Sequence, residues 1–318
     1  MTAVEHPVLR LLGERVAAGS RPGERSDGAR LALAIEGGGM RGAITGGMAL
    51  AIDELGIVAA FDDVYGASAG ALNAAWLLSG AASTGIRTWT DPALRTASVR
   101  RGNLLRGRPI VDSSYLTEVV YERLAPMPFD RILDGDVGFH PLATDAATGE
   151  AVDLAPLIDD RATLKLALRA TTALPLLSGR PIELGGRRFF DAGLAESIPF
   201  RTAIAQGATH LLVLRSRREG EQESANSGRS ARLVARYLSR HSIHVADAFL
   251  GRAERLIRED DELGRAEADP EAVPAIVSLR PPPATPAISR LEKDHQRVLA
   301  GLEAGRREAT TVLGAAIG

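Results

Sequence analysis

Cysteine is absent from the 318-residue sequence. Disulfide bonds, thiolate metal sites and a cysteine nucleophile are therefore excluded. Long apolar runs are also missing, because none approaches the roughly 18 residues that a membrane-spanning helix requires. Residues 1–20 carry Glu5 and Glu14 and lack a basic start followed by an apolar core, so they do not have the pattern of a signal peptide. We therefore expect a cytoplasmic protein.

Lysine is scarce as well, since Lys165 and Lys293 are the only ones and almost all positive charge is arginine. The formal net charge of −2 argues against a global basic surface, so nucleic acid is not an expected partner. Hydrophobic residues make up 45% of the sequence and charged residues 25%, which is typical of a globular protein. The length suits one large domain with a substantial core.

Short apolar runs alternate with helical patterns from residue 31 onward. The order strand, helix, strand, helix over 31–36, 42–55, 62–67 and 69–78 is typical of a parallel sheet covered on both faces. We therefore expect an α/β protein, a three-layer α/β/α sandwich with a mostly parallel central sheet. Further strands are expected at 138–145, 187–190, 210–215 and 275–279, and further helices at 115–124, 162–172 and 199–206.

The chain divides into three expected parts. Residues 1–29 combine a short helix with a polar, glycine-bearing stretch, so we expect a loosely ordered N-terminal arm. Residues 30–280 should form the main domain, in which 216–229 is a polar surface loop and 230–263 is one long helix. Residues 281–318 should form a proline-rich turn and a helix, starting near Ile288, that packs on the domain.

A G-x-S-x-G motif occupies Gly66 to Gly70, where an apolar strand gives way to an alanine-rich helix. A nucleophile elbow needs this context, because its turn is too tight for large neighbours and lifts the serine hydroxyl above the strand. By itself the pattern is common, and a strand-to-helix turn without chemistry would explain it equally well. The position between strand and helix favours Ser68 as a nucleophile, with Gly66 and Gly70 as the elbow glycines.

A glycine run follows the first strand, in the sequence Glu36-Gly37-Gly38-Gly39-Met40-Arg41-Gly42. Uncovered backbone N–H groups at a helix N-terminus suit an oxyanion or a phosphate. The run also fits the dinucleotide pattern G-x-G-x-x-G, but that function needs an acidic residue at the end of the second strand, which instead runs into Ser68. A phosphate-binding loop is disfavoured because no Gly-Lys-Ser/Thr follows.

These two motifs, with two later blocks, resemble those of the patatin-like phospholipases. The later blocks are the small-residue segment from Arg169 to Pro175 and the stretch Phe189-Phe190-Asp191-Ala192-Gly193, trailed by Ser197-Ile198-Pro199. The four blocks stand in the family's order and span residues 31–215.

The resemblance implies a lipid acyl hydrolase of the phospholipase A, lysophospholipase or carboxylesterase type. It implies a Ser-Asp dyad, with Ser68 as nucleophile and Asp191 as base, and no metal or organic cofactor. A lipid or another acyl ester would be the substrate. The implied oxyanion hole consists of Gly37, Gly38, Gly39, Met40 and Arg41.

Two residues depart from the family pattern. Glu36 stands where many members have aspartate, and we expect this difference to matter little because the following amides are the donors. Ala192 stands where glycine is usual, and alanine disfavours positive φ. Arg41 has two interpretations, help to the oxyanion or a lipid phosphate, or an ion pair that fixes the glycine run; we favour the ion pair.

Two other functions compete with the dyad. An α/β-hydrolase triad could use His210, which follows Asp191, although this histidine begins a predicted strand instead of following one. A catalytically silent binding module on the same fold is the second alternative. His241 and His244 are interpreted as surface residues of a long helix, so no metal site is expected.

Two segments could control access to lipid. Residues 91–114 are rich in arginine and glycine without periodicity, so we expect a mobile flap over the site. Residues 228–258 are rich in arginine, while 259–271 are acidic. This segregation could attract the protein transiently to an anionic membrane surface. A solvated helix face that pairs with the acidic stretch is the alternative that we favour.

Overall fold

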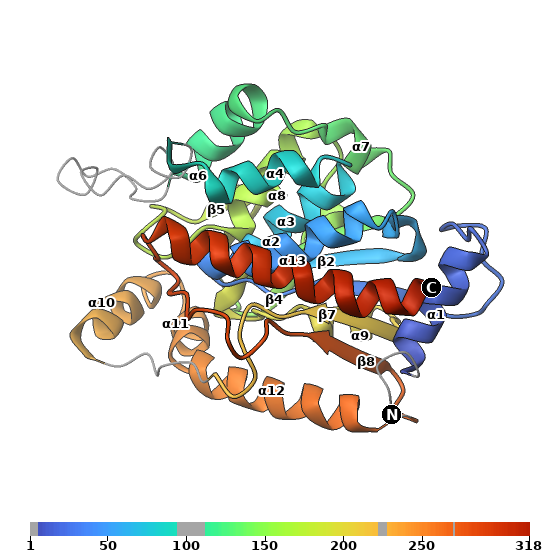
Figure 1. Ribbon diagram of the computed structural model, residues 1–318. Coiled ribbons are helices and arrows are strands. Elements are labelled where there is room, and N and C mark those ends of the chain that lie inside the picture. Colours follow the sequence, from blue (N-terminus) through green and yellow to red (C-terminus); the bar gives the residue numbers. More distant parts are fainter. Residues whose placement is uncertain (1–5, 94–111, 222–227, 270) are drawn as a thin grey trace.

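The computed structural model describes residues 6–93, 112–221, 228–269 and 271–318 (Figure 1). Its centre is an eight-stranded sheet in the order β5-β6-β3-β2-β1-β7-β8, with β4 also paired to β3. The strands β1, β2, β3, β7 and β8 are parallel, whereas β4, β5 and β6 run antiparallel to their neighbours. The strands are β1 Leu31–Ile35, β2 Asp63–Ala67, β3 Gly138–Asp145, β4 Ala151–Asp153, β5 Ile182–Leu184, β6 Arg187–Phe190, β7 His210–Leu214 and β8 Ala275–Leu279.

Helices cover both faces of this sheet, so the predicted α/β/α sandwich is confirmed. The helices near the site are α2 Gly42–Glu54, α3 Ala69–Leu78, α4 Ala82–Thr90, α8 Arg161–Thr171 and α9 Phe200–Ala205. The others are α1 Pro7–Ala17, α6 Ser113–Tyr115, the π-helix η5 Leu116–Leu124, α7 Phe129–Leu133, α10 Gly228–Leu238, α11 Ile243–Leu250, α12 Arg252–Ala268 and α13 His295–Ile317. Short 3-10 turns include η2 Gly39–Arg41 and η7 Ala192–Leu194.

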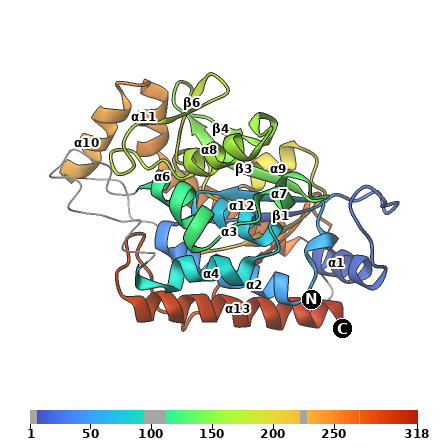
Figure 2. The same ribbon diagram turned by 90° about the horizontal axis from the view of Figure 1, so that it is seen from above.

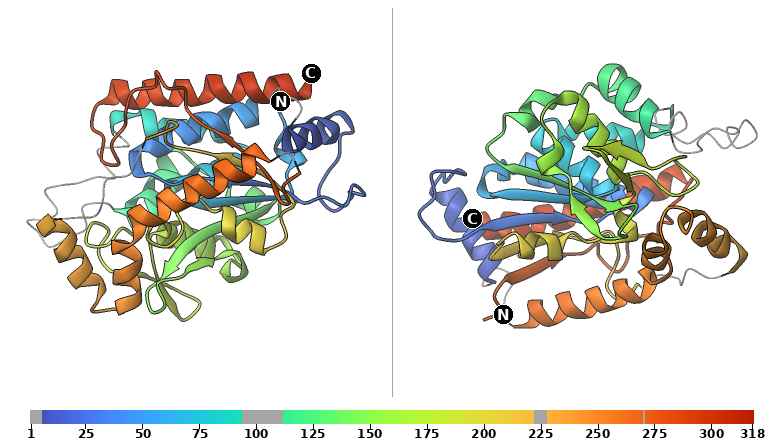
Figure 3. Two further views of the ribbon diagram at one scale, coloured as in Figure 1. Left: turned by 90° about the horizontal axis from the view of Figure 1, so that it is seen from below. Right: turned by 180° about the vertical axis from the view of Figure 1, so that it is seen from behind.

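Strand β1 shows how the layers form. Successive side chains of a strand point to opposite faces, so a strand buried on both faces reads as a continuous apolar run. Leu31, Leu33 and Ile35 join the cluster under α1, α2, α3 and α13. Ala32 and Ala34 join the cluster under α9 and α12. Helix α13 therefore lies outside α2 on one face, and α12 crosses the other (Figures 2 and 3).

The N-terminal segment is not a loose arm, so that expectation is wrong for its described part. Val8 and Leu12 are fully buried against the core. Arg15 is also buried, and its guanidinium donates to Asp27 at 2.8 Å and to Asp62 at 2.7 Å. The polar stretch is held to this helix because its Asp27 pairs with the buried arginine.

The segment expected to be one long helix forms three. Ser242 adopts an extended conformation and its hydroxyl accepts the N–H of His244, which starts α11. Gly251 then separates α11 from α12. The last helix begins later than expected, at His295, because the Asp294 side chain accepts the N–H of Gln296.

Helix α13 packs along α2 through glycines on both helices. A Cβ on Gly47 would lie 2.0 Å from the Leu302 carbonyl oxygen, and one on Gly305 would lie 2.2 Å from that of Ile44. Larger side chains would push the backbones apart. In the described residues, no helix is long and apolar enough to cross a bilayer. The expected flap falls largely on 94–111, outside the described residues.

Leu12 provides a test of the packed N-terminal helix. Leu12→Ala should lower the free energy of unfolding by about 2–5 kcal/mol, because it leaves a cavity under α1. The matched control is Leu233→Ala, since Leu233 is 64% exposed and its loss should change stability by less than about 0.5 kcal/mol. Urea titrations give both values. Equal effects of the two substitutions would contradict the packing of α1.

Candidate active site

Ser68 lies at the turn between β2 and α3, in the conformation of a nucleophile elbow. Its φ of 52° and ψ of −121° are unusual for a residue other than glycine, and such backbone strain is concentrated at functional sites. The chain around it is crowded. A Cβ on Gly66 would lie 2.4 Å from Ala71 Cα, and one on Gly70 would lie 2.2 Å from the Ile35 carbonyl oxygen. Both elbow positions therefore require glycine.

The hydroxyl of Ser68 donates to Oδ2 of Asp191 at 2.7 Å. The other carboxylate oxygen of Asp191 accepts the N–H of Gly193 at 2.8 Å. Asp191 is only 5% exposed, and this burial raises its pKa. The hydrogen bonds from Ser68 and Gly193 and the positive charge of Arg290 oppose the shift. The carboxyl group therefore has a higher proton affinity than an ordinary surface aspartate.

The sheet brings Asp191 to Ser68 by a route that the sequence did not indicate. The sequence predicted a strand at 187–190 within a mostly parallel sheet, but β6 runs antiparallel to β3, with Thr144 paired to Phe190. Strand β2 pairs with β3 so that Ala67 lies opposite Leu142. Continuing both registers by one residue places Ser68 and Asp191 on the two sides of Ala143. The antiparallel direction is what returns Asp191 to the level of the elbow.

Two threonines missed in the sequence hold the pair in place. The Ser68 N–H donates to Oγ1 of Thr171 at 2.9 Å, and Oγ1 of Thr144 donates to the Asp191 carbonyl at 2.9 Å. Both threonines are fully buried. Thr171 belongs to the small-residue block from Arg169 to Pro175, so that block supplies a support for the elbow. The residue after Asp191 needs no glycine, because Ala192 does not have a positive φ.

The glycine run passes directly beside the elbow. A Cβ on Gly37 would lie 2.5 Å from the Ala67 carbonyl oxygen and 3.2 Å from Ser68 Cβ. Of the five amides from Gly37 to Arg41, three already donate to backbone carbonyls. The Gly37 N–H donates to Ser197 and the Met40 N–H to Arg290, both at 3.0 Å, and the Arg41 N–H donates to Gly38 at 3.3 Å.

The amides of Gly38 and Gly39 differ from these three. Within the described part of the chain, neither N–H donates to a protein acceptor. Gly39 has a φ of +59°, and a Cβ there would lie 2.5 Å from the Arg290 carbonyl oxygen. The chain thus turns sharply at Gly39 under a close backbone neighbour. Of the five residues expected to form an oxyanion hole, Gly38 and Gly39 are the two with amides available to a ligand.

Glu36 is buried under the glycine run in a cluster of arginines. Its carboxylate accepts the Ser216 N–H at 2.7 Å and Nε of Arg215 at 3.1 Å, and lies 3.6 Å from Arg217. Burial alone would raise its pKa, but the charges of Arg215, Arg217 and Arg41 outweigh that effect and lower the pKa to about 2. The carboxylate of Glu36 therefore connects the glycine run to the residues that follow β7.

Arg41 contributes to this cluster from the glycine run itself. It is 7% exposed, and its charge is one of those that stabilise the Glu36 carboxylate. A Cβ on Gly38 would lie 3.1 Å from its Nε, so the guanidinium lies under the turn. This placement agrees with the favoured interpretation, an ionic interaction that fixes the glycine run.

His210, the histidine of the alternative triad, lies away from the serine. His210 pairs with Leu31, the first residue of β1, and so lies at the opposite edge of the sheet from Ser68. Its ring contacts the hydroxyl of Thr209 at 2.9 Å. His241 packs against the ring of Phe190, with centroids 5.1 Å apart. Throughout the described ranges, no histidine bonds to Ser68 or Asp191, and no acidic or histidine cluster has the arrangement of a metal site.

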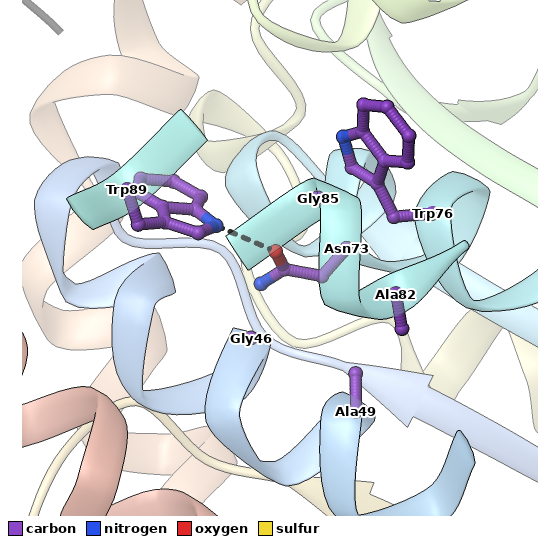
Figure 4. Close-up of a pocket in the computed structure, with 7 residues that line it drawn as sticks. All are labelled: Gly46, Ala49, Asn73, Trp76, Ala82, Gly85 and Trp89. Carbon is purple, nitrogen blue, oxygen red and sulfur yellow. Dashed lines mark hydrogen bonds between the residues drawn. The ribbon is translucent and has the colours of Figure 1, made fainter. Parts of the chain in front are cut away.

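A small cavity lies between α2, α3 and α4, behind the elbow (Figure 4). Two of the residues that line it form a hydrogen bond, in which the Trp89 indole N–H donates to Oδ1 of Asn73 at 3.0 Å. Asn73 in turn donates to the Gly42 carbonyl at 2.7 Å. These bonds brace the helix after the serine against the helix after the glycine run. The cavity is lined by Gly46, Ala49, Asn73, Trp76, Ala82, Gly85 and Trp89.

Comparisons with known proteins identify a family model, a relative and a solved structure that are similar to this chain. A family model of patatin-like phospholipases matches residues 33–204. The chain is 30% identical over 198 residues to the uncharacterized protein YjjU of Escherichia coli strain K12, covering 59% of this chain and 52% of that relative. It thus spans about half the length of this relative. A structural alignment with VipD from Legionella pneumophila covers 90% of this chain and 67% of that one, at 12% identity and a TM-score of 0.49.

The Glu36 cluster generates a prediction about stability and pH. Glu36→Gln should lower the free energy of unfolding at pH 7 by about 3–5 kcal/mol, because it removes the buried carboxylate that lies among the charges of Arg41, Arg215 and Arg217. The folded pKa of about 2 is below the ordinary 4.5, so this contribution is present above pH 4.5 and is lost as pH falls toward 2. The gap between wild type and variant should narrow over that range.

Urea titrations between pH 7 and the lowest pH at which the protein folds measure this gap. Glu303→Gln is the matched control, because the Glu303 side chain is 41% exposed and lies 3.9 Å from the exposed Arg306. Its effect should be below about 0.5 kcal/mol. A Glu36→Gln protein as stable as the Glu303→Gln protein at pH 7 would refute the role of the cluster.

Proposed function

Since the chain belongs to the patatin-like phospholipase family, we propose that it hydrolyses lipid acyl esters with a Ser68–Asp191 dyad. The observation that carries the proposal is the 2.7 Å hydrogen bond from the Ser68 hydroxyl to a buried carboxylate. A serine nucleophile requires a base within this reach. The proposed activity is of the phospholipase A, lysophospholipase or carboxylesterase type.

In the first half-reaction, Ser68 Oγ attacks the ester carbonyl carbon while its proton passes to Oδ2 of Asp191. The carbonyl oxygen becomes an oxyanion that accepts hydrogen bonds from the Gly38 and Gly39 amides. The adjacent positive end of helix α3 favours the same charge. The intermediate collapses when the ester C–O bond breaks, and the departing alkoxide takes the proton from Asp191. The products of this half-reaction are an alcohol and an acyl-Ser68.

Water completes the cycle in a second half-reaction, in which Asp191 takes a proton from the water and returns it to Ser68. Asp191 accepts a proton from the water as the water oxygen attacks the acyl carbonyl. The same two amides hold the second oxyanion. When the intermediate collapses, Ser68 Oγ leaves with the proton from Asp191 and a carboxylic acid is released. Each proton that Asp191 accepts is returned within the same half-reaction, so one carboxylate serves both steps.

The environment of Asp191 suits this task. An exposed aspartate has too low a proton affinity to be an efficient base near neutral pH. Burial raises the pKa of Asp191, which brings its proton affinity closer to that required. The strained elbow and the Thr171 bond hold the serine in position before substrate arrives, so little reorganisation is needed.

The alternatives have less support. A triad through His210 would need that residue at the carboxyl edge of the sheet, whereas it pairs with the first residue of β1. A catalytically silent module would have no need of a strained serine bonded to a buried carboxylate. Labelling with a fluorophosphonate probe separates the silent module from the enzyme, because only an activated Ser68 forms the adduct.

Substitution of the dyad tests the proposed enzyme. Ser68→Ala and Asp191→Asn should each reduce kcat for ester hydrolysis on the order of 10³-fold or more, and the double variant should lose little more than either. The control is His210→Ala, which should keep near wild-type activity. Circular dichroism checks the folding of each protein. A folded, inactive His210→Ala beside an active Asp191→Asn would transfer the chain to the triad hydrolases.

We also propose a transient contact of α10 and α11 with anionic lipid. Leu233 is 64% exposed and Ile243 is 59% exposed on this surface. Exposed arginines lie on and next to α10, and each basic residue near an anionic bilayer adds about 1 kcal/mol of attraction. The exposed arginines on or next to α10 are Arg229, Arg232, Arg236 and Arg240.

Fewer arginines of residues 228–258 are accessible to a membrane than the sequence suggested. Arg252 is buried and donates to the Gly193 carbonyl at 2.6 Å, and Arg255 donates to the Leu194 carbonyl, so neither is available to a membrane. The acidic stretch does not pair with α10 in the described residues. Its ion pairs run from Glu259 and Glu262 to Arg201, and from Asp260 to Arg215 and Arg280.

Liposome co-sedimentation at low and high salt tests the lipid contact. Wild-type protein should bind vesicles with anionic lipid more than neutral ones, and salt should remove the difference. Arg232→Glu should weaken binding by about 2 kcal/mol, since a charge is reversed. The matched control is Arg307→Glu, which reverses a charge at an exposed position of α13. Equal recovery with neutral and anionic vesicles would refute this contact.

A further inference from the structure

A buried arginine of helix α12 contacts the loop that follows Asp191. Arg252 is the first residue of α12, far beyond the family-matched range 33–204, and it is 5% exposed. Its Nε donates to the Gly193 carbonyl at 2.6 Å, and its Nη2 donates to the Ser197 hydroxyl oxygen at 3.0 Å. One planar guanidinium therefore joins two points of this loop.

Both of these points are bonded to the proposed catalytic machinery. The Gly193 N–H donates to Oδ1 of Asp191 at 2.8 Å. The Ser197 carbonyl accepts the Gly37 N–H at 3.0 Å, where the glycine run begins. The loop thus connects the proposed base to the proposed oxyanion hole, and the guanidinium bonds it at each end.

The loop is tightly packed around these bonds. A Cβ on Gly193 would lie 2.9 Å from Oδ1 of Asp191 and 3.4 Å from the Ser197 hydroxyl oxygen. The Ser197 hydroxyl also donates to the Gly193 carbonyl at 3.2 Å, so it shares that carbonyl with the guanidinium. Ser197 is 3% exposed. A change in the guanidinium would therefore displace the groups that bond Asp191 and Gly37.

We propose that Arg252 is a positioning residue for the dyad: its guanidinium closes the turn from Gly193 to Ser197 and so fixes Asp191 relative to the glycine run. This inference rests on the proposed function. Proton transfer from the serine and stabilisation of the oxyanion occur in one step, so the base and the amides need one fixed geometry. Arginine suits this role because its nitrogens donate in a rigid fork, whereas lysine offers a single nitrogen on a flexible chain.

Arg252→Lys tests the bridge, because it keeps the positive charge and removes the fork. With a short, uncharged nitrophenyl ester, kcat should fall on the order of 10²-fold, as expected for a displacement of about 1 Å, while KM stays near the wild-type value. We express kcat per mole of Ser68 that fluorophosphonate labels at completion, so that loss of folded protein does not count. Arg265→Lys, the same change at an exposed position of α12, is the matched control. Leu12→Ala controls for destabilisation elsewhere, and both controls should keep the wild-type kcat.

Ser197→Ala tests the same bridge with a smaller change, the loss of one oxygen atom. It should also lower kcat without changing KM, because the guanidinium loses one of its two anchors in the loop. Since both substitutions open one bridge, the double variant should lose little more than Arg252→Lys alone. If Arg252→Lys does not fold, Ser197→Ala decides the question by itself.

The outcomes separate this inference from the proposed function. A folded Arg252→Lys or Ser197→Ala protein with the wild-type kcat would overturn the role of Arg252 and leave the dyad intact. So would losses that multiply in the double variant, or an equal loss in Arg265→Lys or Leu12→Ala. Wild-type protein that neither hydrolyses esters nor takes a fluorophosphonate on Ser68 would refute the proposed function, and this inference with it.

Discussion

The hydrogen bond between Ser68 and the buried Asp191 is the constraint on which the rest of the site depends. A carboxylate removed from water is unfavourable unless it is paired, and here its partners are the serine hydroxyl and one backbone N–H. Holding that serine requires a backbone conformation that is strained for any residue but glycine. Buried threonines on α8 and β3 and the tightly packed glycines of the elbow stabilise this arrangement.

A second electrostatic cluster supports the glycine run on the other side of the site. Glu36 follows β1, and the arginines that neutralise it lie on the run and after β7. Arg215 also bonds Asp260 of α12, so the cluster connects the sheet to the helix that covers its far face. The connection before α13 then touches the same run through the Arg290 carbonyl. Segments that are far apart in the sequence therefore contact the backbone from Gly37 to Arg41.

Local patterns predicted much of this architecture. The apolar runs gave the parallel strands, and the small residues around Ser68 gave the elbow, because both signals lie within a few residues. Strand direction is a long-range property, so the antiparallel β6 that places Asp191 was missed. The contacts of Thr171 and Arg290 are also long-range and have no local signature. The prediction of one long arginine-rich helix was wrong, because the Ser242 cap and Gly251 divide this segment into three helices. A single cap or glycine is a weak signal beside a continuous helical pattern.

The central claim is that Asp191 activates Ser68, and the most direct measurement is the rate of covalent labelling at that serine. Intact protein treated with a fluorophosphonate, followed by peptide mass spectrometry, should carry one adduct, on Ser68. Its rate of formation should rise with pH as a single carboxyl group ionises, and Asp191→Asn should be labelled far more slowly over the whole range. An adduct on another residue, or equal labelling of the intact protein and Asp191→Asn, would contradict the account.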